Sequence, residues 1–178
     1  MSVENPLLNN ISEVLSFLSD DPGEEEYIRG VIIAKPTMFI PSRTGFMTTN
    51  PLINSEDKLE ESFEKTLEKT ITYIEWDRKP PIKWSTAYFN AGIDHNTARE
   101  IKRGNRVTKP SMLKLVITMQ LDFKRAEHLL ETANFKLNKS SWTDIIVANA
   151  LVQGIYSRSI INDALMQKNA PPLFPNIL

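Results

Sequence analysis

The chain has 178 residues, of which 41% are hydrophobic and 24% are charged, and it has no cysteine. These values are ordinary for a soluble domain, and the lack of cysteine excludes a disulfide framework and cysteine-based zinc or redox sites. No apolar run approaches the roughly 20 residues needed to cross a bilayer, and the first residues lack the pattern of a secretory signal. We therefore expect a cytoplasmic protein with no membrane partner.

The net charge is only −1, but the two signs are unevenly distributed. Residues 1–78 contain 15 acidic and 7 basic side chains, whereas residues 79–125 contain 10 basic and 3 acidic ones. A basic segment beside an acidic one indicates a surface that faces a polyanion, or else an ordinary solvated charged surface.

The first third of the chain is predicted to form a helix followed by an extended arm. A short amphipathic helix is expected over residues 7–18, where apolar side chains recur at helical spacing after Pro6. Residues 27–40 are rich in β-branched and aromatic side chains and favour one or two short strands or an extended arm. We assign residues 1–54 to this N-terminal part, which would pack on the helical core or on a second subunit.

The remaining residues, 55–178, are predicted to form a helical domain, so the expected fold class is a mainly α helical bundle. A long helix over 55–76 has a stripe made by Leu59, Phe63, Leu67, Ile71 and Ile74. Shorter helices are expected over 84–91, 94–104, 111–121, 122–135, 140–154 and 157–168. Their expected N-caps include Asp94, Ser111 and Asp122, and an apolar, proline-containing tail is expected to lie extended across the core.

Residues 84–105 fit a helix-turn-helix, the unit that places the first residues of its second helix in the DNA major groove. Ala87 is the small contact residue, Ala91–Gly92 form the turn, Ile93 is the apolar plug and Asp94 is the N-cap. The candidate base-contacting residues at the start of the second helix are His95, Asn96, Thr97 and Arg99. The candidate phosphate-contacting residues around it are Lys83, Ser85, Lys102, Arg103, Asn105, Arg106 and Lys109.

Residues 86–111 resemble the helix-turn-helix of lambda-repressor-like (Xre-type) regulators through Ala91–Gly92–Ile93, Gly104, Arg106 and Pro110–Ser111. Residues 84–174 are also similar to a C-terminal helical domain of bacterial proteins, some of which have an ADP-ribose-binding macro module. No such module is visible in the first 80 residues, so the resemblance does not imply ADP-ribose binding by this chain. The family often has Gln or Ser where His95 and Asn96 stand, which leaves the preferred DNA sequence open.

The resulting hypothesis is a sequence-specific, DNA-binding regulator, not an enzyme, that acts on double-stranded DNA as a homodimer or with a protein partner. Asn96 would contact adenine and Arg99 guanine. The alternative is an adaptor protein with the same fold, in a toxin–antitoxin, phage-defence or effector setting. The two histidines stand 33 positions apart without a ligand motif, so no metal, cofactor or small-molecule substrate is expected.

Overall fold

A computed structural model describes residues 5–9, 11–16, 18 and 62–175, all within one compact unit. This part is mainly helical and contains no β-strand, which agrees with the predicted all-α class. Its elements are η1 (Pro6–Leu8), α1 (Ile11–Leu15), α2 (Phe63–Thr72), η2 (Tyr73–Asp77), α3 (Trp84–Asn90), α4 (His95–Lys102), α5 (Lys109–Thr118), α6 (Phe123–Thr132), α7 (Trp142–Gln153) and α8 (Arg158–Gln167). The expected arm over 27–40, the boundary at 54 and the expected start of the long helix at residue 55 lie outside the described residues.

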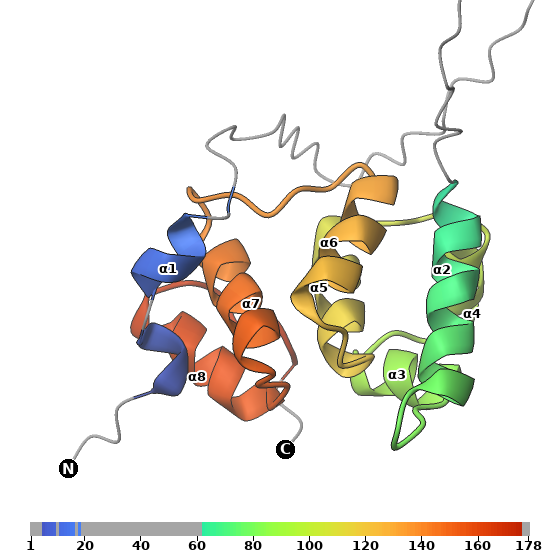
Figure 1. Ribbon diagram of the computed structural model, residues 1–178, viewed down its shortest axis with the longest axis horizontal. Helices are drawn as coiled ribbons and strands as arrows, with labels where there is room; N and C mark the ends of the chain where they lie inside the picture. Colours follow the sequence, from blue (N-terminus) through green and yellow to red (C-terminus); the bar gives the residue numbers. More distant parts are fainter. Residues whose placement is uncertain (1–4, 10, 17, 19–61, 176–178) are drawn as a thin grey trace, which may run out of the picture. The chain divides into compact units, whose positions relative to one another are not determined.

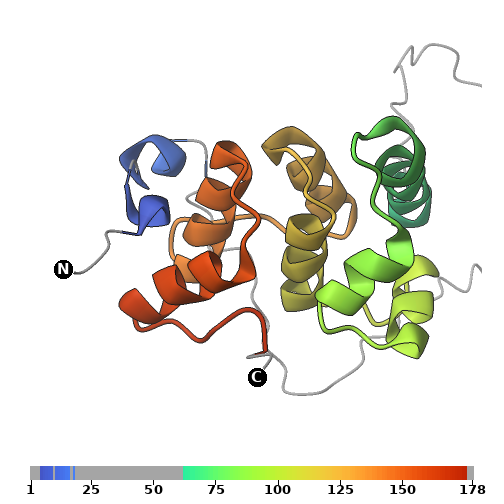
Figure 2. The ribbon, with the colours of Figure 1, turned by 90° about the horizontal axis from the view of Figure 1, so that it is seen from below.

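Helices α5 and α6 lie between two groups of helices (Figure 1). On one side, α2 contacts α6 and α4, and α3 contacts both α4 and α5. On the other side, α7 contacts α5, α6 and α8, and the N-terminal elements η1 and α1 pack against it. The α3–α4 pair, which contains the predicted DNA-contacting residues, therefore lies across α5 and α6 from α1 and α7 (Figures 1 and 2). Arg158, the first residue of α8, reaches the end of α3, where its guanidinium donates to the Asn90 carbonyl at 2.9 Å.

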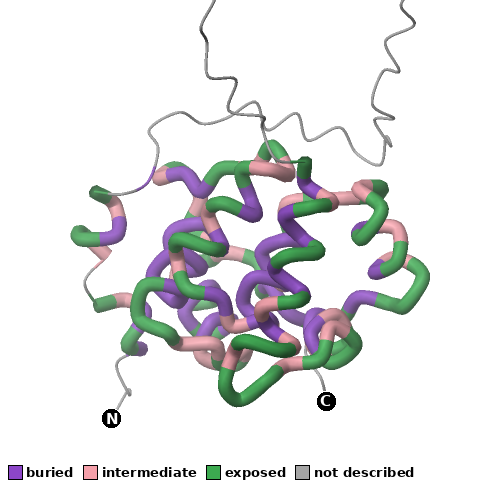
Figure 3. The backbone as a smooth tube through the Cα atoms, turned by 45° about the vertical axis from the view of Figure 1, so that its right-hand side comes forward, coloured by how far each residue is buried: buried purple, intermediate pink, exposed green. Residues whose placement is uncertain are grey.

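Helical periodicity sorts side chains between this core and solvent, as the alternation of buried and exposed backbone in Figure 3 shows. The predicted apolar stripe is confirmed from Phe63 onward, since Phe63, Leu67 and Ile71 of α2 and Ile74 of η2 are all buried. Helix α7 differs because it is apolar on nearly every side, with residues 144–151 all buried. Such a helix is stable only when neighbours surround it, which α5, α6, α8 and the N-terminal segment do.

The single helix expected over residues 7–18 is wrong. The chain forms a 3-10 turn, η1, and then a separate short helix, α1. Between them the backbone at Asn9 is extended, with ψ 146°. The buried side chain of Asn149 on α7 donates to the carbonyl oxygens of Leu7 (2.8 Å) and Asn9 (3.1 Å). Those carbonyls are thus satisfied by a tertiary contact instead of by helical hydrogen bonds, which explains the break.

Similar turns join α3 to α4, α5 to α6 and α7 to α8. Gly92, Gln120 and Gly154 each adopt a positive φ after the first helix. The next residue then bonds back into that helix, as when the Ile93 N–H donates to the Tyr88 carbonyl at 2.9 Å. This arrangement satisfies the last carbonyls of the helix and turns the chain sharply. Glycine adopts such a φ without steric cost, so the local sequence at Gly92 determines the turn between α3 and α4.

The expected start of α5 needs a correction. Its N-cap is Thr108, whose hydroxyl accepts from the Ser111 backbone N–H, and the helix begins at Lys109 instead of after Ser111. Proline is tolerated in the first turn of a helix, where its missing N–H would have no partner. Pro110 therefore lies inside the first turn and does not precede the helix. Of the expected C-terminal tail, Leu173 and Phe174 pack in the core, where both are buried.

No helix in the described part of the chain combines the length and the apolar character that crossing a bilayer requires.

Candidate nucleic-acid interface

The start of helix α4 is set by its N-cap residue, Asp94. One carboxylate oxygen of Asp94 accepts hydrogen bonds from the backbone N–H groups of Asn96 (2.9 Å) and Thr97 (3.0 Å), and the Thr97 hydroxyl donates to the other oxygen at 2.5 Å. The hydroxyl of Thr97, and then the backbone N–H groups, hold the pKa of Asp94 below its ordinary value. The cap was predicted, and it fixes His95 as the first residue of the helix.

One side of α4 is packed and the other is open. Ala98 (1% exposed) and Ile101 (0%) face the core, as predicted from their spacing. On the opposite side of the helix, side chains that recur every three or four positions are all exposed. We call these residues the α4 face: His95, Asn96, Arg99, Lys102 and Arg103. This face has three cationic side chains and no acidic one.

The loop after α4 continues this basic surface. Arg106 is exposed and has a positive φ of 52°. Arg103 and Asn105 are exposed as well, but both donate to Glu100, at 3.1 Å and 3.2 Å. The Asn105 hydrogen bond, and next the charge of Arg103, lower the pKa of Glu100. Within the described ranges, Arg99, Lys102 and Arg106 form no ion pair.

Helix α3 presents its own candidate residues beside α4. Lys83 is its N-cap and Ser85 lies in its first turn, and both are exposed. The Trp84 backbone N–H donates to a carboxylate oxygen of Glu75 at 2.8 Å. One backbone donor at the start of this helix is therefore already bonded to an acidic side chain. Phe89, near the end of α3, is 77% exposed.

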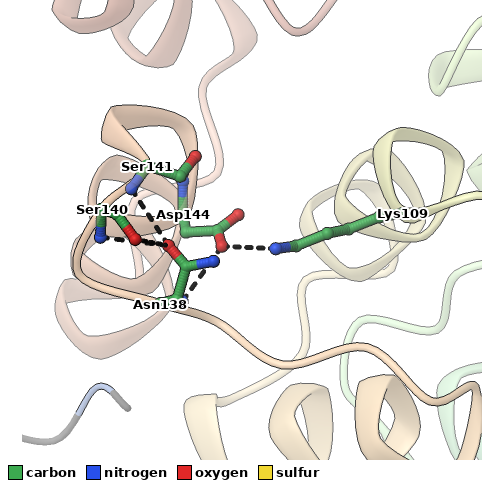
Figure 4. Close-up of polar contacts among 5 residues, drawn as sticks. All are labelled: Lys109, Asn138, Ser140, Ser141 and Asp144. Carbon is green, nitrogen blue, oxygen red and sulfur yellow. Dashed lines mark hydrogen bonds and ion pairs between the residues drawn. The ribbon is translucent and has the colours of Figure 1, made fainter. Parts of the chain in front are cut away.

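The structure separates two residues from the predicted contact set. Thr97 is half-buried, and its hydroxyl donates to Asp94. Less of its side chain is therefore accessible to a ligand than of the exposed residues beside it. Lys109 points toward α7, where its ammonium lies 2.6 Å from a carboxylate oxygen of Asp144 (Figure 4). The Lys109 side chain is 17% exposed and the Asp144 side chain 2%. Lys109 is thus one half of a largely buried ion pair, and we leave it out of the interface proposed below.

The ion pair belongs to a polar network at the start of α7 (Figure 4). The Asn138 backbone N–H donates to the same oxygen of Asp144 at 3.0 Å. The side-chain oxygen of Asn138 in turn accepts from the backbone N–H groups of Ser140 (3.1 Å) and Ser141 (3.0 Å). Because Asp144 lies 35 positions after Lys109, sequence reasoning had no local signal for this partner.

No sequence motif points to a role for Tyr88. Its hydroxyl oxygen lies 3.0 Å from Nδ1 of His95, which links α3 to the first residue of α4. In the described ranges, no three His, Asp or Glu side chains gather in a way that could hold a metal ion.

The sequence was compared with protein-family models, with curated proteins and with solved structures, and none of the three comparisons found a match.

Proposed function

We propose that this protein binds double-stranded DNA through the α3–α4 pair and acts as a sequence-specific regulator. The observation that supports the proposal is the α4 face. A short helix, capped at Asp94 and followed by a basic loop, presents polar and cationic side chains on one side only. A helix of this kind fits the major groove with its first residues against base edges.

The exposed residues divide into two roles in this proposal. Asn96 and Arg99 lie one turn apart on the α4 face and have the chemistry to read adenine and guanine edges, respectively. His95 precedes them as a third base contact, and Thr97 supports the face through the cap. The cations that would lie along the phosphate backbone are Lys83, Lys102, Arg103 and Arg106, with Ser85 and Asn105 as neutral donors.

A salt titration tests the proposal quantitatively. Four phosphate-contacting cations correspond to a slope of about −3.6 in log K against log salt, or roughly a 150-fold loss of affinity between about 50 and 200 mM salt. We expect fluorescence anisotropy with a labelled random-sequence duplex to give a slope of this order. Absence of binding at low salt, or a slope near zero, would contradict DNA binding.

Charge reversal locates the contact surface. Arg103→Glu with Arg106→Glu should abolish measurable binding because two phosphate contacts become repulsive. The matched control is Lys124→Glu with Lys136→Glu, two exposed residues in and after α6 that give the same change in net charge. Equal losses in both double variants would show that overall charge, and not the basic surface around α4, governs the affinity.

A protein-interaction role is the second candidate, and the exposed aromatic side chains favour it. Trp76 is 78% exposed and Phe89 is 77% exposed, whereas most large apolar side chains in the described part of the chain are buried. Aromatic residues are enriched at protein interfaces. Under this proposal, an adaptor would bind no duplex at low salt, and a Trp76→Ala/Phe89→Ala variant would lose its partner without losing stability.

A regulator would need a second copy of the chain to bind a DNA site with two half-sites. Analytical ultracentrifugation of the protein with duplex can measure how many copies bind.

A further inference from the structure

The contact between Tyr88 and His95 joins the two helices of the proposed DNA-binding unit. The Tyr88 hydroxyl oxygen lies 3.0 Å from Nδ1 of His95, and the two ring centroids are 6.0 Å apart. Trp84, one turn earlier on α3, packs edge-on against the Tyr88 ring at a centroid distance of 5.6 Å. Trp84 and Tyr88 are both partly buried against the core. The phenol is therefore held in place, while His95 is exposed on the α4 face.

The chemistry of this hydrogen bond favours one form of the imidazole. A phenol O–H is a good donor, and an unprotonated imidazole nitrogen is a good acceptor. When Tyr88 donates to Nδ1, the neutral ring must hold its proton on Nε2, because the bond made by one nitrogen determines the state of the other. Within the described ranges, Nε2 of His95 makes no hydrogen bond, so this N–H is available to a ligand.

We propose that Tyr88 is a positioning residue that fixes His95 as the Nε2–H tautomer and so makes it a hydrogen-bond donor toward DNA. The identity of the ligand rests on the proposed function, but the tautomer does not. In the major groove, guanine presents two acceptors, N7 and O6, whereas cytosine presents an amino donor. A fixed donor at position 95 selects guanine over cytosine at the base pair it faces. A free imidazole would present either a donor or an acceptor.

The tautomer is measurable without DNA. Long-range ¹H–¹⁵N correlation spectra of the imidazole rings distinguish the two neutral forms, recorded at about pH 8.5, where free histidine is neutral. The chain has only two histidines, so a His128→Gln variant assigns the signals of His95. We expect His95 in the Nε2–H form and, in Tyr88→Phe, a mixture of both forms. The same mixture in both proteins, or an Nδ1–H form in the unchanged protein, would overturn the inference.

The consequence for recognition is tested by selecting bound duplexes from a randomised pool and then measuring single-base variants of the selected site. At one position, guanine should be preferred over cytosine by about tenfold, within the range of a single specific base contact. Tyr88→Phe should reduce that preference severalfold and leave affinity for random duplex and the thermal midpoint nearly unchanged. His95→Ala should remove the preference. An unchanged preference in Tyr88→Phe would overturn the positioning role.

The two proposals fail in different ways. If no duplex binds, DNA recognition by this surface is wrong, and the imidazole spectra still decide whether Tyr88 sets the tautomer. If duplexes bind and the preference at this position is for cytosine, DNA binding holds and the donor role of His95 is wrong.

Discussion

Replacing Lys109 with methionine tests whether this lysine stabilises the fold or contacts DNA. The ammonium lies 2.6 Å from Asp144, and only 2% of the Asp144 side chain is exposed. Removing one partner of a buried pair costs about 3–5 kcal/mol, because the other charge remains in a poorly solvated site. The Lys109 side chain is 17% exposed, and Asp144 keeps the hydrogen bond from the Asn138 backbone, so we expect the lower end, about 3 kcal/mol.

Urea unfolding followed by circular dichroism measures this loss. With a slope of about 2 kcal/mol per molar urea, the midpoint should fall by roughly 1.5 M. Lys102→Met is the matched control: the same substitution at an exposed site should change stability by no more than about 0.5 kcal/mol. A Lys109→Met/Asp144→Asn double variant should recover part of the loss, since no buried charge remains unpaired. A Lys109→Met variant that is as stable as Lys102→Met and binds DNA more weakly would show that Lys109 contacts DNA and does not stabilise the fold.

Three further predictions follow from local contacts. Asn149→Ala removes two hydrogen bonds to the N-terminal segment and should cost about 1–3 kcal/mol, with faster amide hydrogen exchange in residues 5–18; unchanged protection there would contradict it. Gly154→Ala should cost about 1 kcal/mol through its positive φ alone, since no atom lies within 4 Å of the added Cβ; an unchanged midpoint of thermal unfolding would refute this. The pKa of Asp94 is lowered, so its capping contribution exists above the ordinary aspartate pKa and disappears as pH falls through the lowered value. Thr97→Val should raise that pKa, and carboxyl ¹³C titration that shows no rise would contradict the assigned cause.

The elements that the sequence predicts best are those whose boundaries depend on neighbouring residues. Asp94 begins α4 through hydrogen bonds to residues two and three positions later, and Gly92 closes the preceding turn through its positive φ. Ala98 and Ile101 are buried as their spacing requires. The position and the exposed side of α4 could therefore be predicted from some ten consecutive residues.

What the sequence could not predict depends on contacts between distant residues. The helix expected over 7–18 is interrupted because the side chain of Asn149, 142 positions later, donates to the Leu7 carbonyl oxygen in place of a helical N–H. Lys109 fits a basic cluster by sequence, but its partner is contributed by α7. Tyr88 was not predicted to act in the site, because its role appears only when the turn brings α3 beside His95. Local patterns do not specify such pairings, and tertiary packing overrides propensity where they form.

We propose that DNA binds to the side of α4 opposite the core. This is best tested by mapping backbone amide chemical shifts while an unlabelled duplex is added. We predict that the largest changes cluster in residues 91–106 and that α1 and α7, which lie across α5 and α6 from α4, stay nearly unaffected. Changes concentrated in α1 and α7, or none at a saturating duplex concentration, would contradict DNA binding by this surface.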